Sequence, residues 1–129
     1  MIEVYIDGAS AGNPGPSGAG IYIKGNGILE KHSIPLGIMS NHEAEYYSLI
    51  KALEICIVRK FHLVSFRTDS QLVDRAMEKE YVKNKQFIPL LEKAMELSKQ
   101  IDLFFIKWIP SEENQMADKL AREAIRQNK

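Results

Sequence analysis

The stretch "VYIDGASAGNPGPSGAGIYI", residues 4–23, decides the fold because it joins two strand patterns through a run of turn-forming residues. Apolar and polar side chains alternate over residues 2–7, which predicts a strand that ends on the carboxylate Asp7. The glycines, prolines and asparagine of residues 8–18 predict a loop, and residues 19–24 predict a second strand. A buried strand that ends on one acid, followed by glycine-rich backbone, suggests a functional site if other parts of the chain place further polar residues beside Asp7.

The remainder of the chain predicts one more hairpin strand and then alternating helices and strands. The sequence Gly25-Asn26-Gly27 is a strong signal for a tight hairpin turn, followed by a third strand over about 28–36. A cap at Ser40 or Asn41 precedes apolar residues at helical spacing. We expect helices over 41–58, 71–78, 87–100 and from 111 onward, and strands over 62–69 and 102–109.

This order of elements predicts an α/β fold in a single domain spanning residues 1–129. The first three strands should form an antiparallel meander, and the last two should be reached by helical crossovers, giving a five-stranded mixed sheet.

Composition narrows the class of protein. Hydrophobic residues make up 45% and charged residues 26%, as in ordinary soluble domains. Seventeen basic and 17 acidic residues give a net charge of zero, which argues against a nonspecific polyanion binder. The single Cys56 excludes an internal disulfide. We expect a cytoplasmic protein without a membrane segment, because the sequence shows neither a basic leader pattern nor an apolar run of about 20 residues.

Four acids are placed at the ends of predicted elements. Asp7 and Asp69 end strands, whereas Glu45 and Asp118 lie in the first turns of helices. Each acid by itself is more commonly a helix cap or a solvated charge. Together, at one edge of a sheet, they would repel one another unless a cation neutralised them. Oxygen ligands favour Mg²⁺ or Mn²⁺, and two such ions support phosphoryl chemistry.

Four stretches resemble ribonuclease H type 1, in the order found in that family. They are "YIDGASAGNPGPSGAG" (5–20), "SNHEAEYYSLIKALE" (40–54), "FRTDSQLV" (66–73) and "KWIPSEENQMADKLARE" (107–123). The resemblance covers nearly the whole chain. It implies a ribonuclease H-like sheet with helices on both faces. It further implies an endonuclease that cleaves the RNA strand of RNA/DNA hybrids with two Mg²⁺ ions, or alternatively Mn²⁺, and leaves 5′-phosphate ends.

The resemblance also assigns residues. It implies that the metal ligands and catalytic residues are Asp7, Glu45, Asp69 and Asp118. It implies that the hybrid is contacted by Gly8, Asn13, Ser40, Asn41, His42 and Gln71. Glycines 8 and 12 would leave the backbone open to the substrate.

Three departures from the family keep alternatives open. Residues 108–114 contain no counterpart of the family's loop histidine, and residues 79–87 replace a longer basic, tryptophan-rich protrusion. His42 stands where the family has a second asparagine, and Trp108 is expected in the core. One alternative is therefore a weak or inactive nucleic-acid-binding protein, and another is a nuclease for a different polynucleotide. We expect a monomer rather than a homodimer.

Overall fold

Strands and helices follow one another along the chain in the expected order. The computed structural model describes residues 1–128. Its strands are β1 (Ile2–Ser10), β2 (Gly15–Gly25), β3 (Ile28–Met39), β4 (Leu63–Thr68) and β5 (Leu103–Trp108). Its α-helices are α1 (Asn41–Val58), α2 (Gln71–Lys79), α3 (Ile88–Ser98) and α4 (Gln115–Arg126), with short 3₁₀ turns η1 (Lys85–Phe87) and η2 (Ser111–Glu113).

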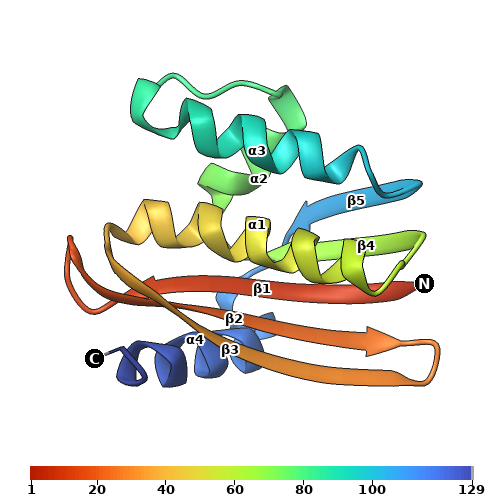
Figure 1. The fold of residues 1–129 in the computed structure, drawn as a ribbon, viewed down its shortest axis with the longest axis horizontal. Helices are drawn as coiled ribbons and strands as arrows, with labels where there is room; N and C mark the ends of the chain where they lie inside the picture. The colour runs from red at the N-terminus through yellow and green to blue at the C-terminus, as the bar shows by residue number, and fades with distance from the viewer. Residues whose placement is uncertain (129) are drawn as a thin grey trace.

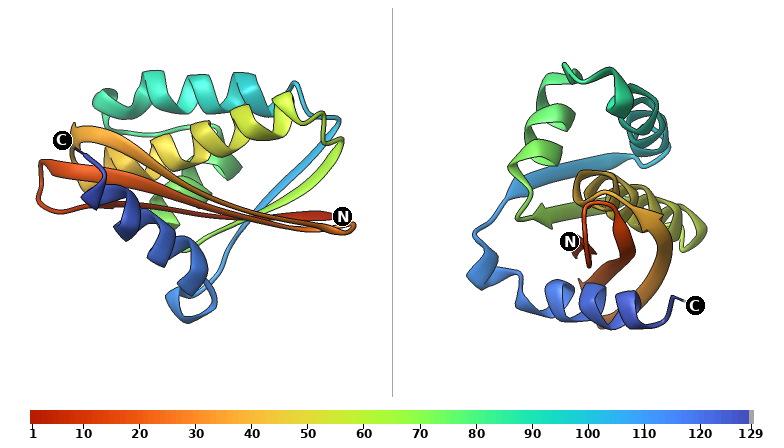
Figure 2. Two further views of the ribbon diagram at one scale, coloured as in Figure 1. Left: turned by 60° about the horizontal axis from the view of Figure 1, so that its bottom comes forward. Right: turned by 90° about the vertical axis from the view of Figure 1, so that its left-hand side faces the viewer.

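The strands form one mixed sheet in the order β3-β2-β1-β4-β5 (Figure 1). β1, β2 and β3 are antiparallel neighbours, and β4 pairs in parallel with both β1 and β5. Helices α1, α2 and α3 lie on one side of the sheet, and α4 covers the other side (Figure 2). The predicted five-stranded α/β fold with helices on both faces is confirmed.

The main core lies between the sheet and α1. The alternation in β1 turns Ile2, Val4 and Ile6 toward this layer, where all three are buried. The side chains on the other face of β1 point toward α4, and Asp7 is one of them. The two-sided pattern of this strand therefore separates the core from a polar face.

The first loop is shorter than predicted. β1 continues past Asp7 to Ser10, β2 begins at Gly15, and residues 8–10 pair with residues 17–19 in the antiparallel ladder. The predicted loop over residues 8–18 is confirmed only for residues 11–14, and the placement of Asp7 at the end of the strand was wrong.

The glycines of this region are packing positions, which explains the error. A Cβ on Gly8 would lie 2.0 Å from the carbonyl oxygen of Ala44 in α1. A Cβ on Gly20 would lie 1.9 Å from the carbonyl oxygen of Ala117 in α4. The missing side chains allow both helices to lie directly on the sheet. The side of Gly8 that we expected to be open to a substrate is filled by α1.

Local signals elsewhere were read correctly. Asn26 and Gly27 both have positive φ, as a two-residue hairpin turn requires. Ser40 caps α1 through the backbone N–H of Glu43, and the Glu43 carboxylate accepts from the Ser40 N–H, completing a capping box. Ser70 caps α2 through Val73 N–H. No helix within residues 1–128 has the length and apolar content that a membrane span needs.

Candidate active site

Parallel pairing of β1 with β4 brings the first two acids together. The register places Ile6 opposite Thr68, so the next residues along each strand, Asp7 and Asp69, lie side by side. Asp69 directly follows the end of β4, where ligands gather in open α/β sheets. The sheet therefore places two carboxylates, Asp7 and Asp69, beside each other on neighbouring strands.

The other two acids come from the helices on opposite faces of the sheet. Glu45 lies in the second turn of α1, and Asp118 lies near the start of α4. Besides burial, the negative charges of Asp69, Asp118 and Glu45 all act on the Asp7 carboxyl and raise its pKa. The four acids that the sequence singled out are thus brought together.

Asp7 is the most strongly perturbed group of this cluster. Burial raises the pKa of Asp7, and the adjacent charges of Asp69, Asp118 and Glu45 raise it further, to about 9. A carboxyl in this environment must bind a proton or be neutralised by a cation. The carboxylate donor set fits a hard divalent cation such as Mg²⁺ or Mn²⁺. Within residues 1–128, no three acidic, histidine or cysteine side chains are yet close enough to enclose one ion, so binding would require side-chain adjustment.

Asp118 has a basic neighbour on its own helix. The Nη2 atom of Arg122 lies 2.7 Å from Oδ2 of Asp118, one turn further along α4. An open cavity of about 370 Å³ lies beside them and is also lined by Gln115 and Lys119. The site is therefore flanked on this side by two exposed cationic residues and space for an anionic polymer.

Glu45 is held by residues from the first turn of α1. The Nδ1 atom of His42 lies 2.9 Å from Oε1 of Glu45, and Nδ2 of Asn41 lies 3.5 Å from the same oxygen. The Glu45 side chain is only 15% exposed. Two of the residues expected to bind the substrate therefore contact a predicted metal ligand.

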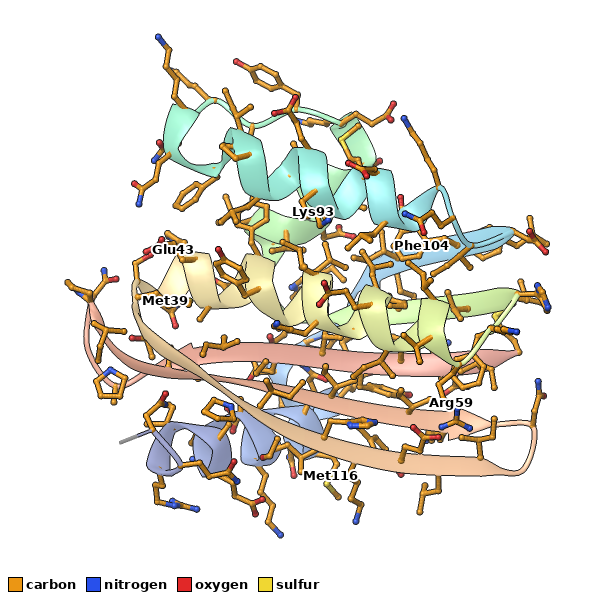
Figure 3. The ribbon with its side chains drawn as sticks, in the orientation of Figure 1. Met39, Glu43, Arg59, Lys93, Phe104 and Met116 are labelled. Carbon is orange, nitrogen blue, oxygen red and sulfur yellow. The ribbon has the colours of Figure 1, made fainter. Side chains whose placement is uncertain are left out.

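The other expected substrate-binding residues lie around the same end of α1. The Asn13 side-chain oxygen accepts a hydrogen bond from the Asn41 backbone at 3.1 Å, which ties the first loop to the helix. Ser40 acts as the helix cap, so its hydroxyl oxygen is already engaged. Figure 3 shows Glu43 of the capping box beside Met39 and far from Arg59, which marks the opposite end of α1. Gln71 is the exposed first residue of α2, two positions after Asp69.

Sequence reasoning missed Asn114. This residue is 1% exposed, and its Nδ2 donates 2.9 Å to the backbone oxygen of Ile6, the residue before Asp7. Its own backbone oxygen accepts from Asp118 N–H at 3.1 Å. Asn114 thus connects the strand that carries Asp7 to the helix that carries Asp118. An asparagine between a turn and a helix looks like an ordinary cap in sequence, so no local signal distinguished it.

Trp108 was expected in the core, and that expectation was wrong. Its side chain is 42% exposed, and its indole N–H donates to the backbone oxygen of Asp69 at 3.2 Å. Trp108 lies on the same face of β5 as Phe104 and Ile106, which pack against the main core, but it is the last residue of this edge strand. The indole consequently lies at the margin of the acidic cluster.

The chain is similar in sequence to a described protein family and to known proteins. A family model described as "Reverse transcriptase-like" matches residues 5–124. The protein "Putative hydrolase EbsB" of Enterococcus faecalis is 40% identical over 97% of this chain and 94% of its own length.

Two solved structures share the fold at closely similar length. Ribonuclease H1 of the archaeon Halobacterium salinarum is 34% identical, with a TM-score of 0.90 over 98% of both chains. LC11 ribonuclease H1, solved in complex with an RNA/DNA hybrid, is 33% identical, with a TM-score of 0.89 over 98% of both chains.

Proposed function

This chain belongs to the ribonuclease H type 1 family, and from that premise we propose that it is an endonuclease that hydrolyses the RNA strand of RNA/DNA hybrids. The observation that carries the proposal is the convergence of Glu45, Asp69 and Asp118 on the half-buried Asp7 carboxyl. Because four acids in one partly buried place are costly without a cation, their presence favours an active metal-dependent site.

Each acid has a distinct place in the proposed site. Asp7 and Asp69, which lie side by side on parallel strands, would hold both of two Mg²⁺ or Mn²⁺ ions. Glu45 and Asp118, which arrive from the two faces of the sheet, would complete the ligand sets of one ion each. When bound, the ions activate the attacking water and stabilise the leaving oxygen.

The surrounding residues would orient the hybrid. Asn13 and Asn41 are hydrogen-bonded to each other and lie next to Glu45, so their remaining polar atoms can face the minor groove. Gln71 follows Asp69 at an exposed helix start. Contacts of such groups with a 2′-hydroxyl would distinguish the RNA strand from the DNA strand. Gly8 would contribute only its backbone, because α1 occupies its side-chain space.

A second candidate function is binding of the hybrid without efficient cleavage. It is favoured by the segment after β5, which forms the short turn η2 and supplies Glu112 and Glu113 where the family has a loop histidine. A carboxylate could accept a proton in place of an imidazole, but these two side chains are exposed at the turn.

The test is cleavage of an end-labelled RNA/DNA hybrid with Mg²⁺ or Mn²⁺, beside single-stranded RNA, duplex RNA and duplex DNA. We expect cuts in the RNA of the hybrid that leave 5′-phosphate ends. The variant Asp69→Asn should keep the fold and lose cleavage. Asp102→Asn, which alters an exposed acid paired with His62, should cleave like the wild type.

Other outcomes would redirect the assignment. Cleavage by Asp69→Asn at the wild-type rate would contradict the proposed site. Hybrid binding in Ca²⁺ without products in either active metal would support the binding function. Preferential cleavage of another duplex would replace the hybrid as the substrate.

A further inference from the structure

His42 lies in the first turn of α1 and directs one ring nitrogen at Glu45. Nδ1 lies 2.9 Å from Oε1, which is the length of a sound hydrogen bond. An ionised carboxylate can only accept, so the Nδ1–H form of the imidazole is the donor. Glu45 is 15% exposed and His42 is 57% exposed, so the histidine forms the solvent side of this contact.

The contact leaves one carboxylate oxygen open. His42 and Asn41 both approach Oε1 of Glu45, at 2.9 Å and 3.5 Å. Among the hydrogen bonds found within residues 1–128, none is made to Oε2. With Oε1 held from the helix start, Oε2 is the atom of Glu45 that remains to bind a cation.

The imidazole ring is itself held in place. Phe87, at the end of η1, meets His42 edge-on with ring centroids 6.0 Å apart. Phe87 is buried and stacks on Tyr46 at 5.3 Å, and Tyr46 is fully buried beside Glu45 in α1. A ring supported in this way loses less rotational freedom when it binds Glu45 than a free side chain would.

We propose that His42 is a positioning residue, which fixes the rotamer of Glu45 through the Nδ1–Oε1 hydrogen bond so that Oε2 faces the metal site. This inference rests on the proposed function, and it changes the role first expected for His42, which was contact with the hybrid. Hydrogen bonds from outer residues commonly orient metal-binding carboxylates in this way and affect metal affinity directly. The imidazole needs no charge for this role, because the neutral ring also has one N–H donor.

The variants His42→Ala and His42→Gln test the proposal. Alanine removes the hydrogen bond, whereas glutamine can again donate to Glu45 through its amide. Mn²⁺ affinity is measured by titration calorimetry without nucleic acid, and the Mg²⁺ midpoint and the KM for the hybrid are measured in the cleavage assay. His62→Ala is the matched control, since His62 also lies about as near a carboxylate, Asp102, at 3.0 Å, but both side chains are exposed and outside the acidic cluster.

We expect His42→Ala to weaken Mn²⁺ binding about tenfold, the lower end of the range for such outer residues, because His42 is partly exposed. The Mg²⁺ midpoint should rise by a similar factor, and the KM for the hybrid at saturating metal should change less than about twofold. His42→Gln should recover most of the metal affinity, and His62→Ala should leave it unchanged.

Two results would overturn the inference. Unchanged Mn²⁺ affinity in His42→Ala, with or without a higher KM, would show that His42 does not act through Glu45. A glutamine variant as weak as the alanine variant would show that ring packing on Phe87, rather than the hydrogen bond, is what matters. If the wild type binds Mn²⁺ but cleaves no hybrid, the proposed function fails, and the calorimetric comparison still decides the role of His42.

Discussion

Replacing Asp7 by asparagine is expected to stabilise the metal-free protein while removing cleavage. The side chain keeps its shape, but the group that is forced to ionise in a buried, negatively charged place is gone. Asp7 is held close to Asp69, Asp118 and Glu45 and cannot move away, because it lies within β1 rather than at its end.

The size of the effect follows from the raised pKa of Asp7. Its pKa is raised from 3.8 to about 9 in the folded, metal-free protein. A group with a raised pKa contributes stability that is fully present below the unfolded value and is lost as the pH rises toward the folded value. A pH of 7 lies about 3 units above the unfolded pKa, so about 4 kcal/mol of the stability present at low pH has been lost by pH 7. The asparagine side chain in Asp7→Asn does not titrate, so the variant escapes this loss.

Urea unfolding in the presence of EDTA measures the prediction. We expect the free energy of unfolding of Asp7→Asn to exceed that of the wild type by about 2–4 kcal/mol at pH 7, by about 2 kcal/mol at pH 5, and by almost nothing near pH 3.5. Saturating Mg²⁺ should narrow the gap at pH 7, because the ion stabilises the wild type by binding only its folded form.

The control is Asp102→Asn, in which an exposed carboxylate is changed instead. Its effect should stay within about 0.5 kcal/mol and show little dependence on metal. The reasoning would be refuted if Asp7→Asn were less stable than the wild type at pH 7 without metal, or if the gap did not shrink between pH 7 and pH 4.

Three further predictions address the scaffold around the site. Gly20→Ala should lower the free energy of unfolding by about 3 kcal/mol in urea, because its Cβ would lie 1.9 Å from the Ala117 oxygen and α4 would have to move off the sheet. Asn114→Ala should cost about 1–3 kcal/mol by leaving the buried oxygen of Ile6 unpaired, and it should lower kcat in the hybrid assay more than KM. Burial raises the pKa of the Cys56 thiol to about 12, so this thiol should not react with a disulfide reagent at pH 8 until urea unfolds the protein. The protonated thiol contributes stability below about pH 9, and this contribution should be lost as the pH rises toward 12.

Much of the fold could be predicted because its signals are local. Alternation in β1, the Asn26-Gly27 turn and the caps Ser40 and Ser70 each depend on neighbours within a few residues, so they can be read without a partner segment. The order of these elements then limits the sheet to few topologies, and right-handed crossovers select among them. The four candidate acids were likewise selected by their predicted position at element ends and by their family pattern, although Asp7 lies within β1.

The errors arose where a residue serves a distant segment. Gly8 and Gly18 fall in the predicted loop, yet they lie in strands because α1 and α4 need the space of the missing side chains. Trp108 was expected in the core, yet it is the last residue of the edge strand, and its indole N–H donates to the backbone of Asp69, 39 positions away. In each case the deciding neighbour lies many residues away in the sequence.

The sequence by itself determined which elements form and in what order, and it indicated which acids are candidates for the site. Only the tertiary structure decided that Asp7 is a half-buried carboxyl within β1, that Asn114 links β1 to α4 across 108 positions, and that His42 hydrogen-bonds to Glu45. The physical reason is the separation in sequence between the residues that interact. Strand alternation, turns and caps arise from contacts within one or two turns of chain, whereas burial, close backbone packing and carboxylate repulsion arise only when separate segments meet.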